Sequence, residues 1–322
     1  MKAAVYYKAG PPSVFRYEDV PDPECHPSGV LVDVKAISIE GGDTLNRAGG
    51  ELASKPHIVG YQCAGVIREI GANVTDRVVG QPVVAVMGNG SHASMVSVPD
   101  AATWLVPEGL DLERAACVPI AFATADDCLF EFGHLKAGEA VLIQAGAGGV
   151  GLAAIQLAKR AGATVLATAS SDEKLERLKE FGLDHGINYK AADFVAAARE
   201  ITGGRGVDLV LDSVGGRTLS GSLHCLAYRG RAITVGQAGR DFSRPDIGLL
   251  STANRSLTGV SLAMEIALQP QRTRAMIDGH LRDVAAGSLK VVIDRSYPLS
   301  EAAEAHAYIE SRQAFGRVLL MP

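Results

Sequence analysis

The chain has 322 residues, of which 47% are hydrophobic and 21% charged, and its formal net charge is −5 at pH 7. This composition indicates a globular protein with room for two domains, and the weak negative charge argues against nucleic acid or an anionic membrane as the main partner. No apolar stretch approaches the ~20 residues that span a bilayer, and the N-terminus becomes polar too soon for a signal peptide. We therefore expect a cytoplasmic protein.

The cysteines are scattered and form no CxxC pair, which excludes a disulfide framework and a zinc ribbon. We expect them to be small buried hydrophobic residues in a reducing compartment. They are Cys25, Cys63, Cys117, Cys128 and Cys225.

The first part of the chain, residues 1–123, is predicted to be mostly β. Residues 30–39 alternate apolar and polar side chains, as a half-buried strand does, and residues 63–71 and 81–87 are further short apolar runs. The segments between them, including Glu40–Asp43, contain the Gly, Asp and Pro residues that favour turns. Many short strands at this spacing indicate a sandwich or a barrel. A helical pattern follows from about Leu112, with Pro119 interrupting it.

Residues 139–258 alternate between strand and helix. Strands are predicted at 141–146, 163–170, 186–189, 207–216 and 231–239, and helices at 150–161, 172–182 and 193–204. Gly182 stands where a helix C-cap is expected. Repeated β–α–β units with nearly continuous apolar strands indicate a parallel sheet covered on both faces, which binds ligands at the carboxyl ends of its strands.

The last part, residues 259–322, breaks this rhythm. A helix is predicted at 273–289, a strand at 291–299, a helix at 301–312 and a strand at 317–321. From the pattern alone, these last strands either extend the central sheet or return to the N-terminal domain.

The segment 141–151, VLIQAGAGGVG, carries the main functional signal. Gly146, Gly148 and Gly151 stand at the GxGxxG spacing of a dinucleotide-binding turn between a strand and a helix. The first glycine allows the sharp turn, the second lets the backbone approach a pyrophosphate, and the third lets the helix pack close to the strand. The N–H groups at the start of the helix then face an anion.

The tip of the second strand indicates which dinucleotide is bound. An NAD-preferring site places a carboxylate there, whereas this chain has Ser170 and Ser171, with Lys174 one turn later. We therefore expect NADPH. Alternatively, Ser170 and Glu173 form a capping box and Lys174 is a solvated helix residue. Asp172 and Glu173 would mildly repel a phosphate.

The chain resembles zinc-independent members of the medium-chain dehydrogenase/reductase superfamily, of the quinone oxidoreductase (zeta-crystallin) type. The resemblance is carried by residues 144–174, 184–189, 200–216 and 315–322. It implies an α/β protein in which a Rossmann doubly wound parallel sheet (124–258) is inserted in a GroES-like β-rich catalytic domain formed by residues 1–123 and 259–322. It also implies NADPH in the cleft between the domains, and a homodimer or a dimer of dimers formed by edge strands of the Rossmann sheets.

The same resemblance assigns cofactor contacts to loops that follow the strands. They are Gly148, Gly149 and Val150 at the pyrophosphate, Ser170, Lys174 and Tyr189 at the 2′-phosphate and ribose, Ser213, Val214 and Gly215 at the adenosine, and Thr124, Gly236 and Gln237 at the nicotinamide. Arg317 occupies a basic position near the cofactor in many relatives. The alternative for Arg317 is an exposed basic residue before a terminal strand.

The chain departs from zinc-dependent relatives at the positions of their ligands. Glu40 replaces a cysteine, Tyr61 a histidine and Gln62 a glutamate, and the four-cysteine lobe is missing. Because tetrahedral zinc favours Cys and His ligands, we expect no metal, and a set formed by Glu40, Asp43 and Cys63 is disfavoured.

The chain also departs from typical quinone reductases, which carry Asn at the position of Glu40 and Tyr at the position of Leu45. Glu40, with a pKa raised by burial, is a candidate general acid; alternatively it caps the Gly41–Gly42 turn or pairs with Arg47. Tyr61 is a candidate phenolic donor. Asp43 matches the family's acidic position and has either a catalytic or a structural role.

These features predict an NADPH-dependent, metal-free reductase that transfers a hydride to a quinone or an α,β-unsaturated carbonyl compound. Two alternatives stay open. The first is a zinc-independent alcohol dehydrogenase, which would need a base near its operating pKa; His57 is the nearest candidate in the sequence. The second is a non-enzymatic NADPH-binding protein of the zeta-crystallin type.

Overall fold

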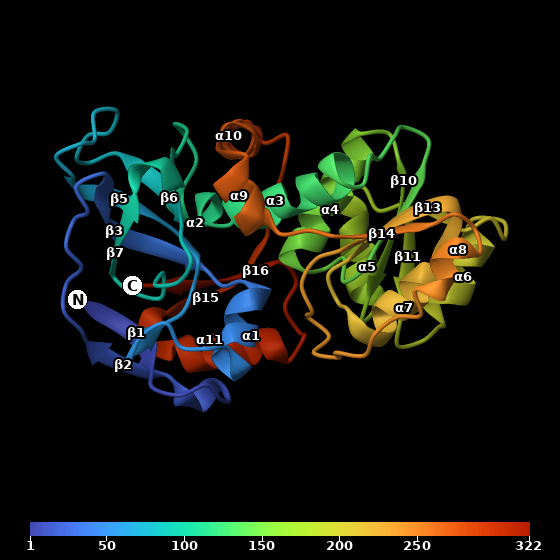
Figure 1. Cartoon of the computed structure of the whole chain (residues 1–322), viewed down its shortest axis with the longest axis horizontal. Coiled ribbons are helices and arrows are strands. Elements are labelled where there is room, and N and C mark those ends of the chain that lie inside the picture. Colours follow the sequence, from blue (N-terminus) through green and yellow to red (C-terminus); the bar gives the residue numbers. More distant parts are fainter. The chain divides into compact units, whose positions relative to one another are not determined.

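The computed structural model describes residues 1–322 and divides into two compact units. The terminal unit consists of residues 1–120 and 274–322, and the central unit of residues 121–273 (Figure 1). The chain thus returns to its first unit after completing the second. The expected boundaries lay at residues 123 and 258. Helix α9 and the start of α10 instead belong to the central unit, where Arg272 donates hydrogen bonds to Asp127 and Glu265.

The terminal unit contains ten strands and few helices. The strands are β1 (Lys2–Tyr6), β2 (Arg16–Asp19), β3 (Gly29–Ser38), β4 (His57–Ile58), β5 (Gln62–Ile70), β6 (Pro82–Val86), β7 (Met95–Pro99), β8 (Thr103–Leu105), β15 (Ile293–Pro298) and β16 (Arg317–Met321). The helices are α1 (Gly41–Gly49), α2 (Leu112–Ala115), α11 (Ala302–Glu310) and most of α10 (Pro270–Ala285), and α3 (Val118–Asp126) runs from this unit into the central one.

The main sheet of the terminal unit joins both ends of the chain. Its order is β15-β16-β3-β5-β6-β8, β7 pairs with β3, and a small sheet has the order β2-β1-β4. Strand β16 is antiparallel to β3, with Leu319 opposite Ser38. Strand β3 is buried over most of its length, so the expected half-buried strand was wrong, and Val32 and Val34 lie in the core with Leu320. The C-terminal strands therefore complete the GroES-like domain, which confirms the expected fold class.

Helix α1 was not expected, because its first residues were interpreted as a turn. Three glycines give the segment Gly41–Gly49 a low helix propensity. Hydrogen bonds at its N-terminus compensate. The Asp43 carboxylate accepts a hydrogen bond from the Glu40 backbone N–H (2.8 Å), and the Thr44 hydroxyl donates to the Gly41 carbonyl (2.8 Å).

The central unit is built on a parallel sheet. Its strands are β9 (Ala140–Ile143), β10 (Thr164–Ala169), β11 (His185–Asn188), β12 (Val207–Asp212), β13 (Leu226–Thr234) and β14 (Ser256–Gly259). After α3 and a π-helical turn (Asp127–Glu131), its helices are α4 (Gly149–Arg160), α5 (Asp172–Leu178), α6 (Phe194–Ile201), α7 (Gly216–Cys225), α8 (Gly248–Ser251) and α9 (Leu262–Leu268).

The strand order of this sheet is β11-β10-β9-β12-β13-β14, and every pair is parallel. This is the doubly wound order 3-2-1-4-5-6, in which the direction of winding reverses between the first and fourth strands, here β9 and β12. Ligands of such sheets bind outside the carboxyl ends of the strands at that reversal. The Rossmann part of the expected fold is therefore confirmed, and it places the glycine-rich turn at this position.

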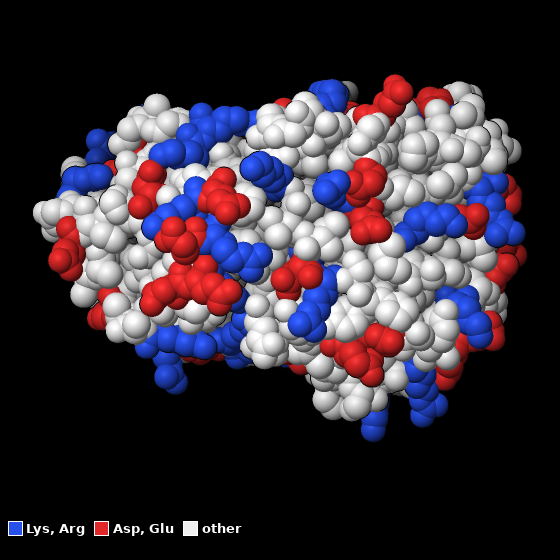
Figure 2. Space-filling view, turned by 180° about the vertical axis from the view of Figure 1, so that it is seen from behind, with Lys and Arg blue, Asp and Glu red and all other residues white.

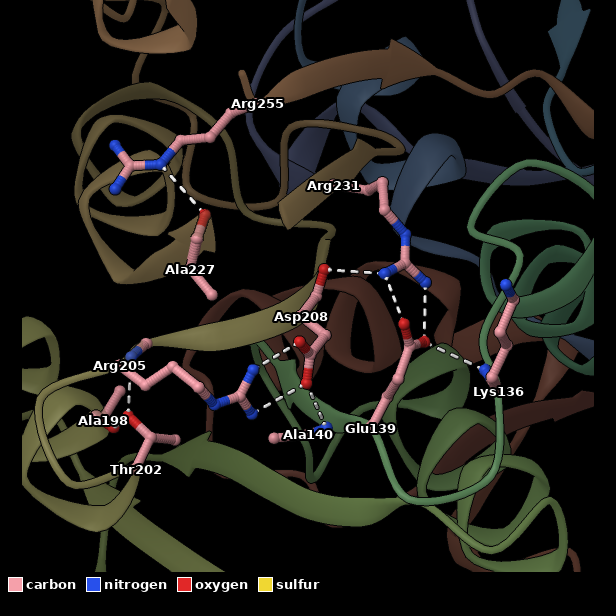
Figure 3. A network of polar contacts seen from close by, with 11 residues as sticks. Lys136, Glu139, Ala140, Ala198, Thr202, Arg205, Asp208, Ala227, Arg231 and Arg255 are labelled. Carbon is pink, nitrogen blue, oxygen red and sulfur yellow. Dashed lines mark hydrogen bonds and ion pairs between the residues drawn. The ribbon is translucent and has the colours of Figure 1, made fainter. Parts of the chain in front are cut away.

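An ion-pair network holds three strands together at the opposite, amino-terminal end of the sheet (Figure 3). Arg231 of β13 makes a two-point contact with Glu139, at 2.7 and 2.8 Å, and donates to the Asp208 carbonyl of β12. The Asp208 carboxylate accepts from the Ala140 N–H of β9 and pairs with Arg205. Charged groups thus stabilise the end of the sheet that is remote from the glycine-rich turn.

The surface carries mixed charge. Figure 2 shows one face, on which Lys and Arg are interspersed with Asp and Glu, and neither sign dominates. None of the helices combines the length and the apolar character that spanning a bilayer would require. All five cysteines are free thiols, and four of them are buried.

Candidate functional site

The glycine loop lies between the end of β9 and the start of α4. A Cβ at Gly146 would lie 2.9 Å from the Ala167 Cβ, and one at Gly151 would lie 2.4 Å from the Ala145 oxygen. Both positions therefore require glycine for packing. Gly148 differs, because its nearest neighbour would be the Ala145 oxygen at 3.4 Å, an ordinary contact beside otherwise open space. Gly146 and Gly151 are thus required by packing against the neighbouring strand and loop, and the left-handed turn itself is made at Ala145, with φ of 55°.

Helix α4 begins at this loop without a side-chain cap. The N–H groups of Gly149, Val150 and Gly151 belong to its first turn, where an α-helix has no internal acceptors. The first turn carries no acidic side chain, and Lys159 and Arg160 lie in the last turn. The positive end of the helix dipole and unpaired N–H donors therefore face the open space at Gly148. This arrangement fits a phosphate group of a dinucleotide.

The next strand end brings together the residues that were expected at the adenosine 2′-position. Ala169 of β10 is opposite Asn188 of β11, and the Tyr189 N–H donates to the Ala169 carbonyl (3.2 Å). Ser170 and Tyr189 thus follow the carboxyl ends of neighbouring strands. The hydroxyl groups of Ser170 and Tyr189 and the ammonium group of Lys174 are hydrogen-bond donors of the kind that bind a phosphate monoester.

The N-cap of α5 differs from the expected one. The cap is Ser171, whose hydroxyl oxygen accepts from the Lys174 N–H at 3.3 Å, so the capping box at Ser170 and Glu173 was wrong by one residue. The side chain of Ser170 is therefore not used to begin the helix. Asp172, whose charge would repel a phosphate, accepts a hydrogen bond from the Asn188 amide (3.0 Å).

The loops that follow β12 and β13 are joined to each other by backbone hydrogen bonds. The Ala238 N–H donates to the Ser213 carbonyl (3.0 Å) and the Gly239 N–H to the Val214 carbonyl (2.9 Å). Gly215 and Gly236 both have positive φ, 78° and 76°, which favours glycine at these turns. The loop containing Gln237 is therefore held against the loop 213–215. Thr124, the remaining residue assigned to the cofactor in this unit, is buried on α3.

The expected catalytic residues lie in the terminal unit, around a buried ion pair. Arg317 of β16 donates to both carboxylate oxygens of Glu40, to the Ser38 hydroxyl (2.9 Å from Nε) and to the Ile39 carbonyl (2.9 Å). The Gln62 amide also donates to Glu40, and its oxygen accepts from the Ile120 N–H (3.1 Å).

These contacts decide between the roles considered for Glu40 and Arg317. Glu40 stands at the N-cap of α1, as one alternative predicted, and its carboxylate pairs with Arg317 rather than with Arg47, which pairs with Glu310. Arg317 is 7% exposed, so the interpretation as an exposed basic residue was wrong. Burial raises the pKa of Glu40, and the Arg317 charge opposes that shift. Burial likewise tends to lower the pKa of Arg317, but the Glu40 charge raises it above its ordinary value.

Asp43 and Tyr61 lie beside this ion pair. Asp43 is fully buried, and its Oδ1 has no hydrogen-bond partner. Burial raises the pKa of Asp43 well above its ordinary value, and the Glu40 charge adds to the shift. The Tyr61 hydroxyl lies against Gly42, where a Cβ would be 2.7 Å from it. Burial raises the pKa of Tyr61 as well, with further contributions from Asp43 and Glu40, so Tyr61 is a neutral phenol that can donate a hydrogen bond.

The residues at the zinc-ligand positions do not fit a zinc ion. Glu40 already binds a guanidinium, and Tyr61 and Gln62 are not zinc ligands of the usual kind. Cys63 is fully buried, and burial raises the pKa of its thiol to about 12, which disfavours the thiolate. No group of three or more His, Cys, Asp and Glu residues in the structure is arranged to hold a metal.

Sequence reasoning missed four buried polar residues beneath the glycine loop. They are Gln144, Thr168, Asp212 and Ser222. A signal was present, because each of the first three stands at the end of a buried apolar run: Thr168 near the end of β10, Asp212 at the end of β12 and Gln144 directly after β9. It also missed the partner of Glu40, since nothing in the local sequence connects residue 40 with residue 317.

Two family models match the chain. The alcohol dehydrogenase GroES-like domain matches residues 26–108, and the zinc-binding dehydrogenase model matches residues 149–279. The chain is 36% identical to the 2-haloacrylate reductase of Burkholderia sp over an alignment of 335 residues, which covers 99% of this chain and 98% of the relative.

Solved structures show the same similarity over the whole chain. Escherichia coli quinone oxidoreductase, complexed with NADPH, has a TM-score of 0.95 and 30% identity, with 100% of both chains covered. Quinone oxidoreductase of Pseudomonas syringae has a TM-score of 0.94 and 31% identity, covering 100% of this chain and 99% of that one. The chain belongs to the medium-chain dehydrogenase/reductase superfamily and, within it, to the quinone oxidoreductase type.

Proposed function

We propose that the protein is an NADPH-dependent reductase that transfers a hydride to a conjugated carbonyl compound, a quinone or an enone. The observation that carries this proposal is the uncapped start of α4 beside the open space at Gly148. The similarity to a quinone oxidoreductase complexed with NADPH and to a 2-haloacrylate reductase supports both the cofactor and the reaction class.

The central unit supplies the residues that would hold the cofactor. Backbone N–H groups of Gly149 and Val150 would bind the pyrophosphate, and Ser170, Lys174 and Tyr189 would bind the 2′-phosphate. When bound, NADPH supplies the hydride from C4 of its nicotinamide. The loops 213–215 and 236–237 would enclose the remaining parts of the dinucleotide. Arg317, which was assigned to the cofactor, has its guanidinium engaged with Glu40 and Ser38, so we assign it to the organisation of the catalytic residues.

The terminal unit supplies a hydrogen-bond donor for the substrate carbonyl. We assign this role to Tyr61, because its phenol stays protonated at neutral pH. A donor placed at the carbonyl oxygen stabilises the negative charge that develops there during hydride transfer. Glu40 has both carboxylate oxygens engaged, so its role is to hold Arg317 and Gln62 rather than to deliver a proton. Asp43 fixes the start of α1, next to Tyr61.

The test is a substrate panel containing quinones, enals, enones and a 2-haloacrylate, followed by the loss of NADPH absorbance, with NADH and with alcohol plus NADP+ as further arms. We expect turnover of at least one conjugated carbonyl, with kcat/KM higher for NADPH than for NADH. Tyr61→Phe is expected to lower kcat by about tenfold or more and to leave NADPH binding intact. NADPH binding without turnover of any compound, or a preference for NADH, would contradict the proposal.

We also propose that the protein forms a homodimer through the edge of its central sheet. Strand β14 ends the sheet order and has one neighbour, β13. Two large apolar side chains on the helix that follows it, Met264 and Leu268, are 54% and 67% exposed. Light scattering of the wild type and of Leu268→Glu tests this. A dimer that the substitution dissociates supports the proposal, and a monomeric wild type overturns it.

A further inference from the structure

A chain of buried polar side chains lies beneath the carboxyl ends of the central strands. Gln144 directly follows β9, Thr168 belongs to β10, Asp212 ends β12, and Ser222 belongs to α7. Each is at most 2% exposed. Because buried polar groups cost free energy unless they are hydrogen-bonded, their partners explain why they are there.

One half of the chain ends at the glycine loop. The Ala145 N–H donates to the Thr168 hydroxyl oxygen (3.1 Å), and the Thr168 hydroxyl donates to the Gln144 side-chain oxygen (2.7 Å). The Thr168 carbonyl also accepts from the Gly146 N–H (2.8 Å). Ala145 has φ of 55°, a left-handed conformation that is unfavourable for alanine. Thr168 therefore stabilises the strained residue at which the loop turns toward α4.

The other half ends at the loop 213–215. The Gln144 amide donates to the Ser222 hydroxyl oxygen (3.1 Å), and the Ser222 hydroxyl donates to one oxygen of the Asp212 carboxylate (2.7 Å). The other Asp212 oxygen accepts from the N–H groups of Val214 (2.9 Å) and Gly215 (2.8 Å).

These contacts admit one direction of hydrogen bonding. A backbone N–H can only donate and a carboxylate can only accept, so each hydroxyl in between accepts on one side and donates on the other. The chain therefore runs from Ala145 through Thr168, Gln144 and Ser222 to Asp212. Hydrogen bonds that share groups in this way polarise one another and strengthen together. Removing one side chain of this series is therefore expected to weaken the hydrogen bonds at both ends, in the glycine loop and in the loop 213–215.

We propose that Thr168, Gln144, Ser222 and Asp212 are positioning residues that hold the glycine loop and the loop 213–215 in their binding shapes together. None of them is assigned to contact the cofactor. Their effect on affinity rests on the proposed function, because these two loops are the ones we assign to the pyrophosphate and the adenosine of NADPH. The coupling between the loops themselves does not depend on that assignment.

The first experiment measures the dissociation constant of NADPH by fluorescence titration. Thr168→Val keeps the shape of the side chain and removes the hydroxyl, and we expect it to weaken NADPH binding about tenfold. Thr168→Ser is expected to restore most of the affinity. Thr164→Val, the same substitution at the exposed start of the same strand, is the matched control and should change nothing. Unchanged affinity in Thr168→Val, or no rescue by serine, would overturn the role in cofactor binding.

The second experiment follows amide hydrogen exchange without cofactor, in peptides that cover residues 144–152 and 210–220. We expect Thr168→Val and Ser222→Ala each to speed exchange in both peptides, although each residue bonds directly to one loop only. Faster exchange confined to the nearer loop would contradict the coupling. If the wild type binds no NADPH, the proposed function fails while this measurement still decides whether the polar chain couples the loops.

Discussion

Each of the two units buries a hydrogen-bonded carboxylate, Glu40 in the terminal unit and Asp212 in the central unit, and the partners of these carboxylates differ. In the terminal unit, the guanidinium of Arg317 donates to both oxygens of Glu40, and the Gln62 amide is a second partner. In the central unit, Asp212 accepts only from neutral donors, two backbone N–H groups and the Ser222 hydroxyl. One carboxylate is thus balanced by a full charge and the other by dipoles.

This difference determines how each unit responds to change. An ion pair in a buried site is costly to break, because the remaining partner keeps its charge without compensation. A carboxylate held by several neutral donors loses one contact at a time, and each loss costs less. The terminal unit should therefore tolerate changes to its buried charges poorly, whereas changes in the central unit should act mainly on loop geometry and cofactor affinity.

The largest effect is expected for Arg317→Met, which keeps a long apolar side chain but removes the charge. Glu40 would then be buried without its cation, and we expect a loss of about 3–5 kcal/mol in the free energy of unfolding. Urea denaturation measures this loss.

Two further variants separate the ion pair from general disruption. Arg114→Met breaks an exposed pair with Asp111 and should cost at most about 1 kcal/mol. The double variant Glu40→Gln/Arg317→Met should be more stable than Arg317→Met alone, since the uncompensated charge is gone. If the double variant were no more stable than Arg317→Met, the uncompensated charge of Glu40 would not be the cause of the loss in stability.

Asp212→Asn is expected to have the next largest effect. The amide keeps the shape of the carboxylate, but its NH2 group would face a donor, either the Ser222 hydroxyl or the N–H groups of Val214 and Gly215. We expect a loss of about 1–3 kcal/mol in stability, together with weaker NADPH binding. Urea denaturation and NADPH titration give the two values. A loss as large as that of Arg317→Met would show that the two carboxylates are not different in kind.

The sequence predicted the central unit well, because its signals are local. Apolar strands alternate with helices, and the glycines stand at a fixed spacing. Gly182 has the left-handed conformation expected of a C-cap, with φ of 104°, and ends the 3₁₀ turn Lys179–Phe181 that continues α5. The glycine loop needs only neighbours within a few residues and the adjacent strand. Even the error at the start of α5 was local, a shift of the cap from Ser170 to Ser171.

The active-site residues of the terminal unit could be named from their motif, but not their contacts. Glu40 and Arg317 are 277 positions apart, and only the pairing of β16 with β3 brings them together. Helix α1 was missed for a different reason, since its N-terminus depends on the Asp43 side chain and its glycines favour a turn. The Glu40–Arg317 pair follows from a tertiary contact, whereas α1 follows from a local capping box between Glu40 and Asp43, a signal that was present in the sequence but outweighed by the glycines.

The terminal unit also buries a pair of histidines, His92 and His306, and His92 is neutral at neutral pH. His92 Nε2 lies 3.0 Å from His306 Nε2, both side chains are fully buried, and burial lowers the pKa of His92 to about 3. The unfolded chain takes up a proton near pH 6.5, whereas the folded one does so near pH 3, so stability falls as the pH falls between these values. In urea titrations we expect wild type to lose about 1.4 kcal/mol per pH unit more than His92→Gln in this range. Equal slopes of unfolding free energy against pH in wild type and His92→Gln would contradict this role of His92.

The smallest effects are expected for Ser170→Ala and Ser171→Ala, two substitutions at adjacent serines of the central unit that should change different properties. Ser171→Ala removes the N-cap of α5 and should lower stability by about 1 kcal/mol, whereas Ser170→Ala should leave stability unchanged. Ser170→Ala should instead weaken the binding of NADPH more than that of NADH, because only NADPH carries the 2′-phosphate. Urea denaturation and titration with both cofactors measure the two properties separately. If Ser170→Ala weakened both cofactors equally, the hydroxyl would not recognise the phosphate, and the tip of β10 would position the ribose alone.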